Sequence, residues 1–403
     1  MLIEECPYIE PLDAYGAFAG FADSHFLDSG DRDRFAYVVA SPLHKLTAKN
    51  GQVKLDGFPV PGDPIAFDQL DRRMWLISTG IPETSPTARK KRAADRIGII
   101  RKYLRFARPM LETPEIPHTP DIMPWQSNFD RVGYEGAVQT VVDYIHAGDI
   151  FQANLSQSFR AEYAYDVIPK RFDLYRRLSL ASPAPFGAFL NFGDVAVLSN
   201  SPERFLKVAD GQVETRPIKG TRRRGAMPVE DAELAQELML SAKDRAENIM
   251  IVDLLRNDLS KVCKPHSVKT PQICTLESYA NVHHLVSTVT GELLDGKSAV
   301  DLLAACFPGG SITGAPKIRA MEIITELEGS TRGAYCGAIG FIGFNGSMDT
   351  NIAIRSICVN GGRMAFNVGG GIVADSIPAA EYDETLVKAA KIFEALGIRP
   401  YAV

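Results

Sequence analysis

The chain has 403 residues, of which 45% are hydrophobic and 23% charged, so it can bury a large core and is not a disordered polymer. Its formal net charge of −5 argues against nucleic acid or an acidic membrane as a partner, because such partners usually meet a basic surface. No apolar run approaches the length of a membrane span, and Met1–Gly20 lacks a secretory signal pattern. The six cysteines are scattered without a C-x-x-C pair, so we expect a cytoplasmic protein with reduced thiols.

The first part of the chain predicts short strands followed by a helix. Phe35–Ala40 and Met74–Ser78 are rich in aromatic and aliphatic residues and lie between turns that contain glycine and proline. Ala88–Arg108 is rich in helix formers with apolar spacing. These segments predict two strands and one helix.

A proline-rich segment predicts the first boundary. Four prolines fall between Thr113 and Pro124, where they disfavour a helix or a central strand. Asn128–Arg131 then opens a predicted helix that runs to His146. We therefore expect an abbreviated N-terminal portion over 1–120 and a catalytic region over 125–403.

The last third predicts an antiparallel meander. Gly337–Phe344, Ile352–Val359 and Met364–Val368 are strand-like and are joined by Asn-Gly turns, which supply the positive φ of hairpins. Gly369–Gly371 follows this pattern without the parallel context of a dinucleotide-binding loop. It is either a plain tight turn or a place where backbone N–H groups approach an anion.

Two pairs of carboxylates have helical spacing. Asp244 and Glu247 form one pair, and Glu381 and Glu384 form the other, each at i, i+3 on one helix face. Mg²⁺ in proteins is typically held by one or two carboxylates. The alternative is that these carboxylates are simply exposed to solvent on helix surfaces. For the first pair, the apolar segment 249–258 that follows argues against this alternative.

Lys219 is the most informative single residue. It follows Pro217 by two positions, directly precedes Gly220, and lies sixteen residues after Glu203. A lysine held in this way can act as a nucleophile, with the upstream acid as its proton partner. An ordinary surface salt bridge is the alternative.

Three further features place polar groups in apolar or glycine-rich settings. His284 is either a core histidine or a group that faces substrate. Arg355 lies on an apolar strand, where burial would require an anionic partner. Phe307–Lys317 is a loop with two hydroxyls and a cation, which can cradle an anion at the start of the following helix.

Six motifs recur in order along the second part of the chain, namely Gln152–Gln157, Ser201–Phe205, Pro217–Thr221, Lys243–Asn248, Phe307–Lys317 and Gly369–Glu384. This is the order found in chorismate-utilising enzymes, and the chain resembles that family from about Trp125 to Leu396. The resemblance implies an α+β fold of two interleaved lobes of antiparallel sheet flanked by helices, with the active site in the cleft between them.

Two positions indicate the branch of the family. Anthranilate synthases carry alanine where this chain has Lys219, whereas aminodeoxychorismate synthase component I carries lysine. Isochorismate and salicylate synthases place a water-activating lysine where Gln152 stands. The resemblance therefore implies amination of chorismate to 4-amino-4-deoxychorismate, for para-aminobenzoate and folate synthesis. Anthranilate synthase component I and a regulatory chorismate-binding subunit are the alternatives.

The resemblance also implies roles for individual residues. Glu203 would be the general acid, and Lys219 a nucleophile whose pKa should be depressed so that the amine is neutral. Glu247 and Glu384 would hold Mg²⁺, with Asp244 and Glu381 supporting them. The residues expected to bind chorismate are Arg355, Tyr335, Gly370, Gly371, His284, Thr313, Gln152 and Lys388.

Ammonia is the second substrate that the resemblance implies. The chain contains no Cys-His-Glu amidotransferase unit, so a separate glutamine amidotransferase subunit is the expected source of ammonia. Between Ser41 and Trp125 the sequence is several tens of residues shorter than the usual N-terminal part of the family.

Overall fold

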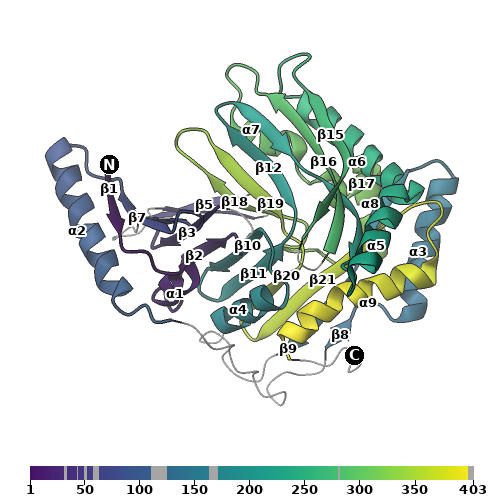
Figure 1. Ribbon diagram of the computed structural model, residues 1–403, viewed down its shortest axis with the longest axis horizontal. Helices are drawn as coiled ribbons and strands as arrows, with labels where there is room; N and C mark the ends of the chain where they lie inside the picture. The colour runs from purple at the N-terminus through teal and green to yellow at the C-terminus, as the bar shows by residue number, and fades with distance from the viewer. Residues whose placement is uncertain are drawn as a thin grey trace.

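A computed structural model describes residues 1–30, 34–42, 44–49, 52–57, 63–109, 125–162, 171–279 and 282–397. Two antiparallel sheets with helices packed against them form the body of the protein (Figure 1), which confirms the predicted α+β fold of two interleaved lobes. The proline-rich segment lies outside the described residues, so the boundary there stays a prediction. No described helix is both long and apolar enough to cross a membrane.

The larger sheet combines strands from the start, middle and end of the chain. Pairing of Asp28 with Gly187 joins the N-terminal strands to the rest. All of its pairings are antiparallel. In spatial order its described strands are β1 (Leu2–Cys6), β7 (Arg73–Ser78), β6 (Ile65–Asp68), β3 (Phe35–Ala40), β2 (Ser24–Asp28), β10 (Phe186–Asn191), β11 (Val195–Ser201), β20 (Ser356–Asn360), β21 (Arg363–Ile372), β9 (Gln152–Glu162) and β17 (Gly314–Ala315), with β8 (Gln126–Ser127) also paired to β9.

The smaller sheet is built from the second half of the chain, and a two-stranded ribbon stands apart from both sheets. The ribbon consists of β4 (His44–Lys49) and β5 (Gln52–Gly57). The described strands of the smaller sheet are, in order, β14 (Ile218–Arg223), β16 (Val282–Glu292), β13 (Gln212–Thr215), β12 (Arg204–Ala209), β19 (Met348–Ile352) and β18 (Ala338–Ile342), with β15 (Lys269–Ser278) paired to β16.

Helices pack on both sheets. The larger sheet carries α1 (Pro11–Gly16), α2 (Pro86–Leu104), α4 (Arg171–Ala181) and α9 (Pro378–Ala395), while α3 (Arg131–His146) and α8 (Lys317–Glu328) pack around β9. The smaller sheet carries α5 (Pro228–Leu240) and α6 (Ala242–Ser260), and α7 (Ala299–Cys306) packs on α6. In Figure 1, α2 lies at the left edge and α9 runs along β21 at the lower right.

Local signals explain how several helices begin. The Asp130 side chain accepts a hydrogen bond from the Gly133 N–H at 2.7 Å, so α3 starts where the sequence predicted it. Ser298 and Asp301 form a capping box at the start of α7. The helix predicted over 88–108 is α2, and the two predicted strands are β3 and β7.

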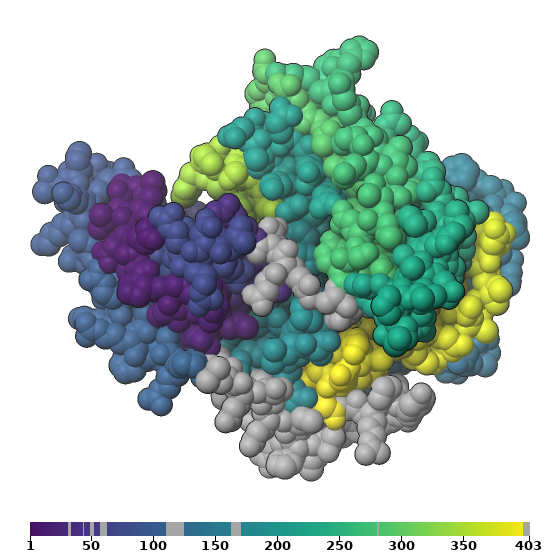
Figure 2. All heavy atoms as spheres, in the orientation of Figure 1, coloured from purple at the N-terminus to yellow at the C-terminus, as the bar shows by residue number. Residues whose placement is uncertain are grey.

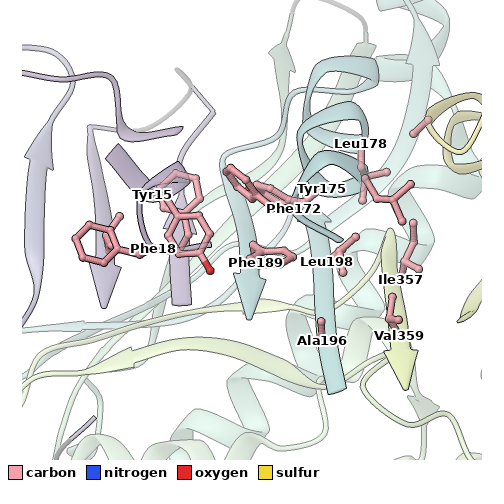
Figure 3. Packing of buried hydrophobic residues seen from close by; sticks show 14 of the residues in the cluster. Tyr15, Phe18, Phe172, Tyr175, Leu178, Phe189, Ala196, Leu198, Ile357 and Val359 are labelled. Atoms are coloured by element: carbon pink, nitrogen blue, oxygen red, sulfur yellow. The ribbon is translucent and has the colours of Figure 1, made fainter. Parts of the chain in front are cut away.

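Aromatic packing dominates the core beneath the larger sheet (Figure 3). Tyr15 packs edge-on against Phe172 and Phe189, with ring centroids 4.9 and 5.6 Å apart. All three rings are buried, and burial of one such side chain stabilises the fold by about 1.5–3 kcal/mol. These contacts join α1 to α4 and β10.

The predicted meander is wrong in its middle strand. The two Asn-Gly turns do close hairpins, β18–β19 and β20–β21. The predicted strand Ile352–Val359 is interrupted, because β19 ends in the smaller sheet and β20 begins in the larger one. Between them Arg355 adopts φ of +50°, which a non-glycine residue adopts rarely. Pairing with β12 on one side and β11 on the other, not the local pattern, splits this segment.

Candidate active site

The two sheets are connected by two short crossings that lie side by side. Glu203 lies in the crossing from β11 to β12, and Arg355 in the crossing from β19 to β20. The N–H of Ile352 donates to the carbonyl of Glu203 at 3.1 Å, and the N–H of Asn200 donates to the carbonyl of Arg355 at 3.1 Å. These hydrogen bonds hold the predicted acid and the predicted anion-binding arginine at the junction between the sheets.

Lys219 sits in an irregularity of β14. The pairing of β14 with β16 slips between Ile218 and Thr221, and Gly220 has φ of +82°. Such a bulge re-aims the side chain that it carries. The Nζ atom of Lys219 donates to the carbonyl of Ser311 at 3.0 Å and lies 2.8 Å from the Glu247 carboxylate.

The electrostatics of the two candidate catalytic groups differ from each other. Burial raises the pKa of Glu203, although Lys219 opposes the shift, so the raised pKa expected of a general acid is present. Burial alone would lower the pKa of Lys219, but Glu247, Glu203 and Glu384 outweigh it and raise the pKa above its ordinary value. The expected depression of the lysine pKa is therefore wrong, because three carboxylates surround the ammonium.

Gln152 opens β9 beside the same carboxylate. Its Nε2 atom donates to Glu247 Oε1 at 2.9 Å, and its buried Oε1 atom has no hydrogen-bond partner among the described residues. A Cβ atom on Gly371 would lie 2.6 Å from Glu247 Oε1 and closer still to the Gln152 amide. The glycine therefore provides room for both side chains.

The triple glycine is part of a strand, so the tight-turn interpretation is wrong, while the approach of its backbone N–H groups to an anion stays a prediction. Gly369–Gly371 lies within β21 and pairs with Ser156, Leu155 and Asn154 of β9. The long-range pairing with β9 extends the strand to Ile372 and was not visible in the local pattern. A Cβ atom on Gly370 would lie 3.3 Å from Glu381 and 3.7 Å from Glu384. The carboxylates of α9 thus approach the strand at Gly370, and Glu247 of α6 approaches it at Gly371.

The four candidate metal ligands lie on two helices, as predicted, but only Glu247, Glu381 and Glu384 approach the glycine strand, whereas Asp244 lies beside Gly220 of β14. Carboxylate oxygens are the donors that Mg²⁺ prefers, and the bare glycines leave the strand accessible to them, so the donor set fits this ion. Within the described ranges, however, no three acidic, His or Cys side chains converge into a metal-binding group. Each carboxylate instead has a basic neighbour: Glu247 has Lys219, Glu384 has Lys388, Glu381 has Lys243 and Asp244 has Arg222.

The two carboxylates on α9 are in different environments. Burial raises the pKa of Glu381, which accepts a hydrogen bond from the Ser376 hydroxyl at 2.7 Å. Partial burial would also raise the pKa of Glu384, but Lys388 at 2.7 Å holds it below its ordinary value. Lys388 also donates to the carbonyl of Gly369 at 2.8 Å, so this lysine lies beside the glycine strand.

Arg355 provides a guanidinium without a counterion. Burial lowers its pKa, and no hydrogen bond or ion pair engages its side chain within the described residues. Arg355 also acts on His284, because its charge adds to burial in lowering the pKa of His284 to about 4. The imidazole is therefore neutral, and its Nδ1 atom shares a hydrogen bond of 2.8 Å with the Thr221 hydroxyl. A half-buried cation for which the described residues supply no counterion marks a site for an anion.

The remaining predicted substrate-binding residues are buried nearby on other elements. Tyr335 is 7% exposed, and the guanidinium carbon of Arg332 lies over its ring, 5.6 Å from the ring centroid. The Thr313 hydroxyl donates to the carbonyl of Gly309 at 2.9 Å. Lys317, the cation of the predicted anion loop, donates to Asp258 at 2.6 Å and therefore serves a buried ion pair.

Sequence reasoning missed the ion pair that holds the walls of the site together. Arg332 donates to Glu328 at 2.6 Å and to the carbonyl of Ile312 at 2.9 Å. Glu328 in turn accepts from the N–H of Ser156 on β9 at 2.8 Å. The i, i+4 spacing of Glu328 and Arg332 was the single local signal.

Two cavities occur elsewhere in the molecule. A cavity of about 430 Å³ lies between the two sheets and is lined by residues of β2, β3, β10, β12, β18 and β19. A second cavity of about 100 Å³ lies under α2. Neither lining includes Glu203, Lys219 or Glu247, so the catalytic candidates lie at the sheet junction and not in the larger intersheet cavity.

The fold and the site together define a class of α+β enzyme, with a buried acid and a lysine between two carboxylate-bearing helices. The chain belongs to the chorismate binding enzyme family, whose profile it matches over residues 34–394. Aminodeoxychorismate synthase component 1 of Salmonella typhimurium is 51% identical over 272 residues, which are 68% of this chain and 59% of that protein. The same component of Escherichia coli is 50% identical over 272 residues, again 68% of this chain and 59% of that protein.

Other relatives come from neighbouring branches. Anthranilate synthase component 1 of Pseudomonas aeruginosa is 46% identical over 279 residues, 69% of this chain and 56% of that protein. Anthranilate synthase component I of Streptococcus pneumoniae shares the structure with a TM-score of 0.77 and 30% identity, over 90% of this chain and 92% of that one. The menaquinone-specific isochorismate synthase of Escherichia coli shares the fold alone, with a TM-score of 0.76 and 18% identity over 98% of this chain and 94% of that one. The chain thus spans less than three-fifths of the length of these sequence relatives.

Proposed function

We propose that this protein is an aminodeoxychorismate synthase component I, which converts chorismate and ammonia to 4-amino-4-deoxychorismate. The observation that carries the proposal is the position of Lys219, buried beside Glu203 and Glu247 at the sheet junction. A lysine in this place can form a covalent intermediate, which an alanine cannot. The sequence relatives named aminodeoxychorismate synthase support the same assignment.

The first step requires departure of the C4 hydroxyl of chorismate. Hydroxide leaves poorly, so a proton donor must convert it to water. Glu203 supplies that proton, because burial raises its pKa and keeps the carboxyl protonated at a higher pH than usual. The C4–O bond breaks as water leaves.

Lys219 provides the electrons for this step. Its neutral amine attacks C2 and forms an N–C2 bond, while the ring double bonds shift toward C4 and expel the protonated hydroxyl. The proton on Lys219 must leave before attack, and Glu247 at 2.8 Å is the nearest group that can accept it. The result is a covalent adduct between the lysine and the ring.

Ammonia completes the reaction. It forms an N–C4 bond, the double bonds shift back, and the C2–N bond to Lys219 breaks. The lysine recovers its electron pair, and the enolpyruvyl group stays on the product. Two displacements in sequence place the new amine where the hydroxyl stood.

Charged groups at the rim of the site orient the two carboxylates of chorismate. Arg355 binds one of them, because its half-buried guanidinium lacks a partner among the described side chains. Glu247 and Glu384 would hold Mg²⁺, whose charge would neutralise the other carboxylate and weaken the hold of Glu247 on the Lys219 proton. Glu381 and Asp244, each three residues earlier on the same helix, would support these two ligands.

Anthranilate synthase component I is the second candidate. One relative of that name is 46% identical in sequence, and another, which is 30% identical, shares the structure with a TM-score of 0.77. The reactions diverge at the nucleophile, because anthranilate synthesis proceeds without Lys219.

One assay separates the two candidates. Purified protein is incubated with chorismate, Mg²⁺ and ammonium, with and without an added aminodeoxychorismate lyase. We expect para-aminobenzoate in the presence of the lyase and no fluorescent anthranilate in its absence. Anthranilate formed without the lyase would overturn the assignment.

The source of ammonia is a separate proposal. The relatives are named component 1, and we propose that a glutamine amidotransferase acts as the partner component. If this is so, glutamine replaces ammonium as nitrogen donor only after the partner is added.

A further inference from the structure

A small cavity lies under α2, away from the sheet junction. It has a volume of about 100 Å³ and opens between α2, the residues after α1, and strands β3 and β6. The region forms the N-terminal lobe at the left of Figures 1 and 2. None of the residues assigned to the proposed reaction lines it.

Aromatic and aliphatic side chains form most of the wall. Phe18, Phe21 and Tyr103 contact one another, with ring centroids between 5.1 and 6.4 Å apart. Phe21 and Tyr103 are more than a third exposed, so they stand at the mouth, while Phe18 is buried. The cavity is smaller than the roughly 150 Å³ apolar cavity that can hold benzene, so a single ring fills it and extends into its mouth.

The charged part of the wall consists of Arg96 and Asp63. Both residues are 6% exposed, which is unusual for charged side chains. The Nη1 atom of Arg96 lies 3.4 Å from Asp63, which is long for a charge-assisted hydrogen bond. The Nη2 atom of Arg96 is buried without a hydrogen-bond partner among the described residues.

The ion pair leaves the guanidinium incompletely compensated. Asp63 also accepts a hydrogen bond of 2.5 Å from the Ser78 hydroxyl, so its charge is shared. Burial lowers the pKa of Arg96 despite Asp63, and Arg92 adds to the effect. A buried cation of this kind is stabilised by an additional anion.

We propose that this cavity is a binding site for a small aromatic carboxylate, whose ring packs among Phe18, Phe21 and Tyr103 and whose carboxylate accepts from Nη2 of Arg96. Ser41 also lines the cavity and offers a hydroxyl to the second carboxylate oxygen. The site is independent of the chorismate site, where Arg355 would bind a carboxylate.

The probe is benzoate, titrated into the full chain by calorimetry, with benzamide as the neutral analogue of equal shape. We expect saturable binding of benzoate at millimolar concentration or below and at least tenfold weaker binding of benzamide. Arg96→Lys keeps the charge but removes the planar fork and should weaken benzoate binding at least tenfold. Arg101→Lys, the same change at an exposed position of α2, should leave the affinity within twofold.

Two further variants test the location of the binding site independently of Arg96→Lys. Ala40→Leu fills the cavity from β3 without touching the ion pair and should abolish binding even if Arg96→Lys fails to fold. Arg355→Lys should leave benzoate binding unchanged. Equal affinity for benzamide, undiminished binding by Ala40→Leu, or loss of binding in Arg355→Lys alone would overturn the proposal. Absence of binding at 10 mM benzoate would overturn it as well.

Discussion

Lys219 Nζ and Glu247 Oε1 lie 2.8 Å apart, and the lysine is held there from a bulge in β14 while the glutamate projects from α6. The pair joins the proposed nucleophile to a proposed metal ligand. Its charge explains why the pKa of Lys219 is raised and not lowered. Anything that draws Glu247 away therefore favours the neutral amine.

Replacement of Lys219 by alanine removes the proposed nucleophile. We expect loss of the covalent adduct and a fall in aminodeoxychorismate formation of roughly 10²-fold or more. Intact mass measured with chorismate and without ammonia reports the adduct as chorismate minus water. The control is Lys269→Ala, an exposed lysine of β15, which should keep the adduct. An adduct on the Lys219→Ala protein would show that another residue is the nucleophile.

Replacement of Glu203 by glutamine removes the proposed acid. General acid catalysis contributes roughly 10²–10⁴-fold, so kcat should fall by that factor. Because the raised pKa keeps Glu203 protonated to a higher pH, wild-type kcat should decline as the pH rises through that pKa. The decline should vanish in the variant when kcat is measured against pH. A variant that retains the alkaline limb would assign it to a different group.

The dependence of activity on Mg²⁺ tests whether Glu384 is a metal ligand, with the neighbouring Asp383 as the control position. Glu384→Gln should raise the Mg²⁺ concentration for half-maximal activity by roughly 10–100-fold, because one ligand charge is lost. Asp383→Asn is the matched control, since Asp383 is on the same helix but pairs with Arg131 at the surface. Activity measured against Mg²⁺ concentration distinguishes them. Equal curves for the two variants would remove Glu384 from the metal site.

Two glycines of β21 should respond differently to alanine. In Gly371→Ala the new methyl meets the ends of the Gln152 and Glu247 side chains, which can rotate away, so activity should fall while unfolding changes little. In Gly369→Ala it meets the backbone of β9, 2.8 Å from the Ser156 Cα, which should destabilise the protein by about 1–3 kcal/mol. Urea unfolding and steady-state kinetics check both. A destabilised but fully active Gly371→Ala protein would contradict the assigned packing.

His284 should make the protein sensitive to acid. Its pKa is about 4 in the folded state against an ordinary value of 6.5, so the unfolded chain binds the proton more tightly. Stability is therefore unaffected above pH 6.5 and is lost as the pH falls toward 4, by about 3 kcal/mol in full. His284→Gln should flatten the Tm profile between pH 6.5 and 4 relative to wild type. Parallel profiles would mean that the imidazole is not buried in the neutral form.

The local sequence pattern was sufficient to predict structure where that structure depends on residues close together in the chain. The helix from Arg131 to His146 begins directly after Asp130, because the Asp130 side chain caps it. That capping depends on Asp130 and Gly133, which are three positions apart. The i, i+3 spacing of Asp244 and Glu247 on α6 was predicted for the same reason. Local pattern failed at Ile352–Val359 and Gly369–Gly371, where the strand ends depend on pairing with β12, β11 and β9.

The sequence by itself determined which chemical groups are available, namely one lysine, one acid and two helical carboxylate pairs in ordered motifs. Only the tertiary structure decided how those groups act on one another, because Glu203, Lys219 and Glu384 meet through strand crossings and helix packing over long separations in the chain. Burial and charge at that meeting point set the proton affinities, which residue identity alone does not specify. The carboxylates around Lys219, invisible in its own motif, are what raise its pKa.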